Sequence, residues 1–235
     1  MPASNRPACA ICGEDLVYKQ EATEFTCHIC GKTEIGHTSC VNGHYVCDMC
    51  HRQAGVNMGL EHCLNSTSTN PIEIMQEMMA GKSVYPNGPE HHSLVGFALL
   101  AAFANAGGGI DKAALLEELR NRSMKVPGGT CGYWGTCGAA ISAGQFWSVI
   151  SKATPLTPDA WTQCQRLTSH ILGKLADIGG PRCCKRTSFV SILEAVAFCK
   201  EQLDVQMDLP EEIKCAHFPR NKQCLKNKCP FYPAK

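Results

Sequence analysis

The sequence predicts a small zinc-binding module, of the treble-clef, ribbon or cross-brace type, followed by an all-α helical bundle and a cysteine-rich tail. Three observations predict this order. Seventeen of the 235 residues are cysteine, and several form regularly spaced pairs near the start of the chain. From Pro71 onward alanine, leucine and methionine dominate, and apolar residues recur with the period of a helix. Three further cysteines then follow in a polar, lysine-rich segment. We expect the module over residues 1–66, the bundle over 67–205 and the tail over 206–235.

Four spaced pairs of metal-ligand residues define the predicted module. Their regular spacing is not needed for a disulfide scaffold, and eight such ligands fit two tetrahedral zinc ions. The segments between them are too short and too poor in aliphatic residues to bury a core, so bound metal must supply much of the folding free energy. Gly13 and Gly31 follow two of the pairs and indicate tight turns around the ligands. The pairs are Cys9 and Cys12, Cys27 and Cys30, His37 and Cys40, and Cys47 and Cys50.

These pairs could be assigned to the two metal ions in two ways. In a sequential arrangement the first two pairs bind one ion and the last two bind the other. In a cross-brace the first pair joins the third and the second joins the fourth, which loops of similar length slightly favour. His28, His44 and His51 lie close to these cysteines in the sequence, and any of them could replace one of the assumed ligands. We favour positions beside the ligands or at the surface, because four pairs already complete two tetrahedra. Such closed sites leave no position for a substrate, so the module is predicted to be a scaffold or docking surface.

Five longer helices are expected in the bundle, after a short amphipathic helix over residues 72–79. Gly107-Gly108-Gly109 and Gly179-Gly180-Pro181 are stop signals, and Thr157-Pro158 is typical of a helix start. Consecutive helices joined by short loops pack as up-down neighbours, so the N-termini of the first, third and fifth share one end. The expected spans are 91–106, 111–122, 137–152, 158–178 and 187–203.

The most reactive-looking residues lie at that shared end of the bundle. Backbone N–H groups, the helix dipole and nearby basic residues favour thiolates there, so we expect lowered pKa values. Flanking glycines leave space for a cluster, sulfide or anionic substrate. Cys164 and Cys199 are instead predicted to be core residues. The candidate cofactor-binding or reactive thiols are Cys131, Cys137, Cys183 and Cys184, and His91 and His92 are candidate acid–base groups or ligands.

The tail predicts one more metal site, formed by Cys215, Cys224 and Cys229. A cysteine followed by proline, as at Cys229, is typical of ferredoxin-type clusters. A fourth ligand must come from elsewhere, and His217, Cys183 or Cys184 could supply it; a labile iron could instead stay open for substrate. If the tail packs on the reactive end of the bundle, the two sets of cysteines form one composite site.

These motifs together resemble an uncharacterised cysteine-rich family, a domain of unknown function found largely in anaerobic archaea and bacteria. The resemblance rests on the paired cysteines, Val126-Pro127-Gly128-Gly129, Cys137-Gly138-Ala139-Ala140 with Gly144, the Cys183-Cys184 pair and the Cys-Pro tail, and it spans nearly the whole chain. Residues 90–200 also resemble proteins to which redox activity is ascribed, named for a Gly-Cys-Ala-x-x-Gly signature and a Cys-Cys pair. This chain departs from that signature, because it reads Gly135-Thr136-Cys137-Gly138-Ala139-Ala140, with residues inserted around the cysteine. The resemblance implies an anaerobic cytoplasm, in which oxygen-sensitive clusters persist.

The net charge and the composition limit the classes of binding partner that we expect. The net charge of +1 gives no general attraction to nucleic acid or acidic membranes, and the first residues lack the pattern of a secretory signal. We expect a cytoplasmic protein with a protein or redox partner on the N-terminal module. The apolar stretch Ala98 to Ala106 leaves self-association open.

Two hypotheses therefore stand, from different functional classes. In the first, the chain is a redox or sulfur-handling protein, with or without enzymatic activity, that uses an Fe–S cluster or reactive thiols at the bundle end. In the second, it is a non-catalytic structural zinc protein that acts as a docking module.

Overall fold

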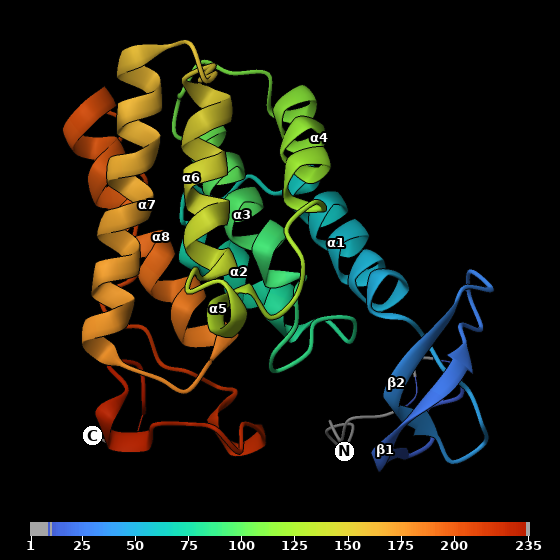
Figure 1. The fold of residues 1–235 in the computed structure, drawn as a ribbon. Coiled ribbons are helices and arrows are strands. Elements are labelled where there is room, and N and C mark those ends of the chain that lie inside the picture. Colours follow the sequence, from blue (N-terminus) through green and yellow to red (C-terminus); the bar gives the residue numbers. More distant parts are fainter. Residues whose placement is uncertain (1–8, 10, 234–235) are drawn as a thin grey trace. The chain divides into compact units, whose positions relative to one another are not determined.

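The computed structural model describes residues 9 and 11–233, which fall into two compact units, Met1–Gly55 and Val56–Lys235. These described residues are mostly helical, as predicted, with one two-stranded sheet among them (Figure 1). The division between the units lies within helix α1 (Asp48–Asn65). The predicted boundaries after residues 66 and 205 stay predictions. No helix in the described part of the chain is both long and apolar enough to cross a membrane.

The first unit is built on a β-hairpin. Strands β1 (Leu16–Thr26) and β2 (Thr33–Cys40) pair antiparallel, with Leu16 opposite Cys40 and an irregularity between Tyr18 and Thr23. The sequence did not indicate this hairpin, because the half-buried face of β2 carries Glu34, Gly36 and Thr38 rather than apolar side chains. The buried side chains of the unit are instead mainly those of cysteines: Cys9, Cys27, Cys40 and Cys47, with Ser39 and Arg52. A core made of sulfur agrees with the expectation that this module needs bound metal to fold.

The second unit contains the predicted helices within a few residues of their expected ends. Helix α8 begins three residues earlier than predicted, because the N–H of Thr187 donates to the carbonyl of Cys183 inside the helix rather than starting it. Helix α1 was not predicted, since metal-ligand spacing rather than apolar periodicity dominates its first turns. Beyond α1 the helices are α2 (Pro71–Ala80), α3 (His91–Asn105), α4 (Lys112–Ser123), α5 (Thr130–Tyr133), α6 (Gly138–Ile150), α7 (Pro158–Ile178) and α8 (Cys184–Leu203), with 3-10 turns η1 (Phe218–Arg220) and η2 (Lys226–Lys228).

Helix α3 is the central helix of the second unit. It is apolar on all sides, and α2, α4, α6 and α8 pack against it. Backbone approach to α6 is close at Gly96, whose N–H donates to Ser142 Oγ over 2.9 Å. The stretch from Ala98 to Phe103, part of the segment that left self-association open, is buried within the chain itself.

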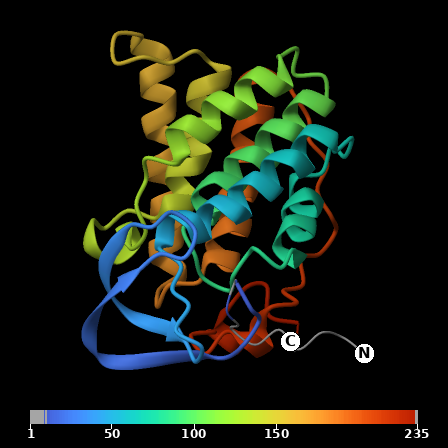
Figure 2. The same ribbon diagram turned by 90° about the vertical axis from the view of Figure 1, so that its right-hand side faces the viewer.

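The N-termini of α3, α6 and α8 lie at one end of the second unit (Figures 1 and 2), as the up-down packing predicts. The backbone N–H of Cys184, at the start of α8, donates to Asn87 Oδ1 in the loop before α3. The tail returns to the same end, where Phe231 packs edge-on against Phe189 of α8 with ring centroids 5.3 Å apart. The topology therefore brings the tail cysteines to the end of the bundle where α8 begins.

Candidate metal centres

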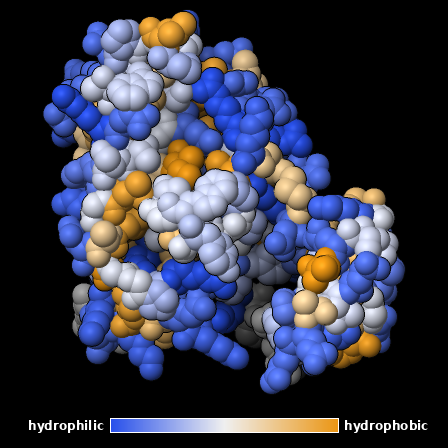
Figure 3. Space-filling view, viewed as in Figure 1, coloured by the Kyte–Doolittle hydropathy of each residue, from blue (hydrophilic) through white to orange (hydrophobic). Residues whose placement is uncertain are grey.

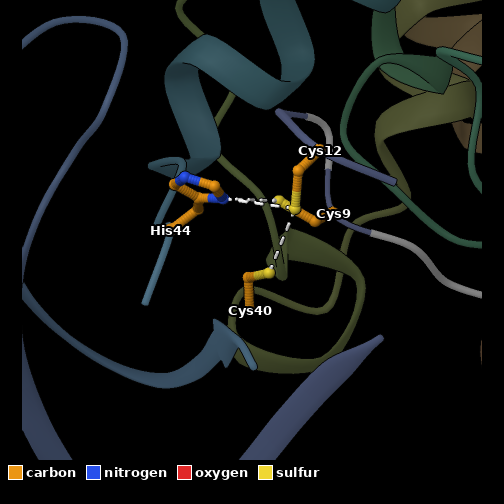
Figure 4. A group of neighbouring side chains, drawn as sticks. All are labelled: Cys9, Cys12, Cys40 and His44. Atoms are coloured by element: carbon orange, nitrogen blue, oxygen red, sulfur yellow. Dashed lines mark hydrogen bonds between the residues drawn. The ribbon is translucent and has the colours of Figure 1, made fainter. Parts of the chain in front are cut away.

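The first group of ligand atoms consists of Cys9, Cys12, Cys40 and His44, which all lie within 4.8 Å of one another (Figure 4). The Sγ atoms of Cys12 and Cys40 are 3.4 Å apart, and His44 Nδ1 lies 3.2 Å from Cys12 Sγ. Tetrahedral zinc with sulfur ligands at about 2.3 Å places its ligand atoms roughly 3.8 Å apart. The four atoms therefore converge as the ligands of one metal ion do.

The second group consists of Cys27, Cys30, Cys47 and Cys50. Cys30 Sγ lies 3.7 Å from Cys47 Sγ, and the N–H of Cys47 donates to Cys27 Sγ over 3.3 Å. Burial opposes ionisation of Cys27, but backbone N–H groups, that of Cys47 foremost, lower its pKa to about 6. Burial and the sulfurs of Cys30, Cys47 and Cys27 raise the pKa of Cys50. A cation between the four sulfurs would relieve the repulsion between thiolates.

The same backbone turn occurs three times in the module, each time at a buried cysteine. In each turn the cysteine carbonyl accepts a hydrogen bond from a glycine N–H three or four residues later. The glycines have φ between 71° and 79°, which L side chains rarely adopt. His44 follows the glycine of the third turn directly, and this turn places the His44 ring beside the sulfur atoms of Cys9 and Cys12. The pairs are Cys9 with Gly13, Cys27 with Gly31, and Cys40 with Gly43.

The structure places His44, and not His37, in the first group. His37 was the predicted ligand, but it is exposed on β2, three residues before Cys40. Residues three positions apart along a strand are about 10 Å apart and face opposite sides of the sheet. The exposed side chain of His37 therefore cannot reach an ion that is bound by Cys40. Gly43, which completes the third turn, was the signal for His44. The two groups join the first pair to Cys40 and the second pair to the fourth, which is the cross-braced order.

A further set of cysteines lines a pocket at the end of the second unit, which we call the tail pocket. Cys183 comes from the residue before α8, and Cys215, Cys224 and Cys229 come from the tail. Asn221 Nδ2 donates to Cys183 Sγ over 3.3 Å. The backbone N–H of Lys226 donates to Cys224 Sγ, also over 3.3 Å. The tail thus contributes hydrogen-bond donors to sulfur as well as thiols.

Cationic side chains line the same pocket. Lys185 is 2% exposed, and its Nζ has no hydrogen-bond partner in the described part of the chain. Arg186 uses Nη2 to donate to the carbonyls of Gly179 and Pro181, while its buried Nη1 has no such partner among the described residues. Burial, together with the positive charges of Lys185 and Arg220, lowers the pKa of His217, another lining residue, to about 4.

The remaining predicted residues lie outside the lining of the tail pocket. Burial raises the pKa of Cys184 to about 12, with Glu90 and Cys137 adding to the shift, so the expectation of a lowered pKa is wrong for this thiol. Desolvation outweighs the helix dipole there. His91 is buried, and its Nδ1 lies 3.0 Å from the carbonyl oxygen of Gly88 and 3.3 Å from Glu90 Oε1.

The other three predicted residues occupy different surroundings. Cys131 is exposed on α5, whereas Cys137 is half-buried at the start of α6. His92 is buried with its ring against Gly138. Of the predicted bundle residues, the structure therefore joins Cys183 to the tail, and it sets Cys137 near Cys184.

The contact between His92 and Gly138 gives a test of this end of the bundle. A Cβ at residue 138 would lie 2.2 Å from His92 Cδ2, so Gly138→Ala must displace a buried ring. We expect a loss of about 1–3 kcal/mol in the free energy of unfolding, measured with denaturant. Gly173→Ala in α7 is the matched control, because nothing lies within 4 Å of its added Cβ. The control should be neutral or gain about 0.5–1 kcal/mol. Equal changes in the free energy of unfolding of the two variants would contradict the close contact between His92 and Gly138.

The comparisons with known proteins concern mainly the second unit. A family model described as "Family of unknown function (DUF5714)" matches residues 60–232. Neither the curated proteins nor the solved structures give a match. The matched span contains all four cysteines of the tail pocket, whereas both four-ligand groups of the first unit precede it.

Proposed function

The chain belongs to the DUF5714 family of unknown function, and we propose that it is a metal-binding redox protein. In this proposal the tail pocket holds an iron–sulfur cluster and the first unit holds two zinc ions. The observation that carries the proposal is that four thiols, one from the residue before α8 and three from the tail, line one pocket within the family's span. The anaerobic setting and the redox role implied by the resemblance above belong to the same proposal.

The arrangement of the thiols favours a cluster over a single zinc ion. In the described part of the chain, the two groups of the first unit are the ones that gather three or more ligand atoms within 4.8 Å. A single zinc ion needs that convergence, with sulfur atoms about 3.8 Å apart. A [4Fe–4S] cluster binds each thiolate at a different iron and therefore needs thiols spaced around a volume. Cys183, Cys215, Cys224 and Cys229 line one pocket without forming a group whose ligand atoms all lie within 4.8 Å of one another, which supports this choice.

The lining of the tail pocket fits such a group chemically. A bound cluster supplies one-electron transfer. The chain's own residues hold and shield it. Phe189, Phe231 and Tyr232 line the pocket and limit the access of water. Asn221 and the N–H of Lys226 donate to cysteine sulfur, as hydrogen bonds that tune cluster potentials do.

The experiment that tests the proposal is the content of zinc, iron and acid-labile sulfide per chain, on full-length protein purified without oxygen. We expect about two zinc ions, together with about four iron and four sulfide, and a visible absorption band from sulfur-to-iron charge transfer. Two or three zinc ions with no iron or sulfide would overturn the cluster.

A docking role for the first unit is a second candidate function, favoured by its exposed apolar residues. Ile11, Ile29 and Met49 lie between paired cysteines, and Val41 follows Cys40; all four are exposed, and apolar atoms are visible on this unit in Figure 3. Loops held by metal would present these side chains rigidly to a protein or redox partner. Zinc without iron in the whole chain would make docking the main function.

A further inference from the structure

We propose that Lys185 is the counter-charge of the tail pocket, and that its ammonium sets the reduction potential of the centre bound there. This inference rests on the proposed cluster. Lys185 is the second residue of α8, almost fully buried, and its side chain lines the pocket together with the four cysteines. Its Nζ has no hydrogen-bond partner among the described residues. A buried ammonium without a partner is costly, so its retention calls for an anion in the pocket.

The chain gives this ammonium a nearby negative charge but, among the described residues, no hydrogen bond. Glu90 is the acidic side chain within electrostatic reach of Lys185. Its Oε1, however, accepts the N–H of Tyr85 over 3.0 Å and lies 3.3 Å from His91 Nδ1. The other charged or titratable groups around Lys185 are Cys183 and Cys184, Arg220, His91 and His217. Only thiolates among these can be anions, and Cys183 is the one that lines the pocket.

Arg186 adds a second positive charge to the lining. Its Nη2 is already occupied by two carbonyls, but Nη1 is buried without a partner in the described chain. The positive charge of Arg186 interacts with Cys229, and that of Lys185 interacts with Cys183. Because Arg186 also fixes the loop at Gly179 and Pro181, Lys185 is the cleaner residue to vary.

The charge of the centre gives the direction of the effect. A cluster held by four thiolates is an anion in its oxidised state and gains one more negative charge when it takes up an electron. A fixed positive charge in a low-dielectric pocket therefore stabilises the reduced form more than the oxidised form. Lys185 should raise the reduction potential, and its removal should make the potential more negative.

The test is an anaerobic redox titration of the full-length protein with dithionite as the electron donor, followed by electron paramagnetic resonance, after iron and sulfide have been measured. Lys185→Met should keep the iron content of the native protein and shift the midpoint potential to more negative values. Lys185→Arg, which keeps the charge, should restore most of the native potential. Lys174→Met removes an exposed lysine of α7 and should change nothing.

The outcomes separate this inference from the proposed function. Native protein without iron and sulfide overturns both. Native iron content with an unchanged potential in Lys185→Met overturns the role of Lys185 alone, as does an equal shift in Lys174→Met. If Lys185→Met does not retain iron, Lys185→Gln is titrated in its place, and the same negative shift is expected because the charge is lost. Failure of both variants to retain iron would also overturn the inference, since the residue would then be needed for assembly.

Discussion

Replacement of Cys183 by alanine is expected to remove nearly all iron and sulfide from the protein while the two zinc ions stay bound. Cys183 is buried beside α8 and is the ligand that this helix contributes to the tail pocket. Without it the tail is left with three thiols and no covalent link between cluster and bundle. Cys224→Ala should have the same effect from the tail side. Metal and sulfide analysis of each variant, purified without oxygen, measures the result.

Two control variants in the same helix make this prediction specific. Cys184→Ala removes the adjacent thiol, which does not line the tail pocket, and should keep the cluster. Cys199→Ala removes a fully buried core thiol further along α8 and should lower stability without loss of iron. If Cys183→Ala or Cys224→Ala retained the iron of the native protein, the composite site of bundle and tail would be wrong.

Replacement of His44 by alanine is expected to lower the zinc content from about two ions per chain to about one and to unfold part of the first unit. Structural zinc contributes about 10–16 kcal/mol of binding free energy to small modules, more than such a module can replace by burial. Zinc per chain, measured during titration with a chelator, would report the loss. The circular dichroism of the full-length protein before and after chelation would report the unfolding.

His37→Ala is the matched control for His44→Ala, because both change one histidine within the same unit. The side chain of His37 is exposed on β2 and belongs to neither ligand group, so this variant should keep both zinc ions and the native resistance to the chelator. The opposite pattern, with zinc lost from His37→Ala and kept in His44→Ala, would contradict the assignment.

Local signals in the sequence were enough to predict six helices of the second unit, namely α2, α3, α4, α6, α7 and α8, but not α1 or α5. Asp111, the first residue of the expected span 111–122, caps α4, with its Oδ1 accepting the N–H of Ala114 over 3.0 Å, and Pro158 stands at the start of α7. Capping and stop signals act between residues a few positions apart, so the sequence displays them directly. The apolar residues of α7 did not reveal by themselves which of them are buried: Leu167 and Ile171 are buried, whereas Trp161 is exposed. Which part of an apolar face is covered depends on neighbouring helices.

The sequence by itself determined the types of metal-ligand residue, the approximate bounds of the main helices, and the end of the bundle at which the N-termini of α3, α6 and α8 meet. Only the tertiary structure decided which ligands combine. Cys183 and Cys184 are adjacent and chemically identical, but Cys183 has an extended backbone before the helix and Cys184 is the first residue of α8, so one thiol lines the tail pocket and the other does not. His37 and His44 differ in the same way, by strand and turn geometry around Cys40. Spacing along the chain is a local property, whereas coordination depends on distances through space.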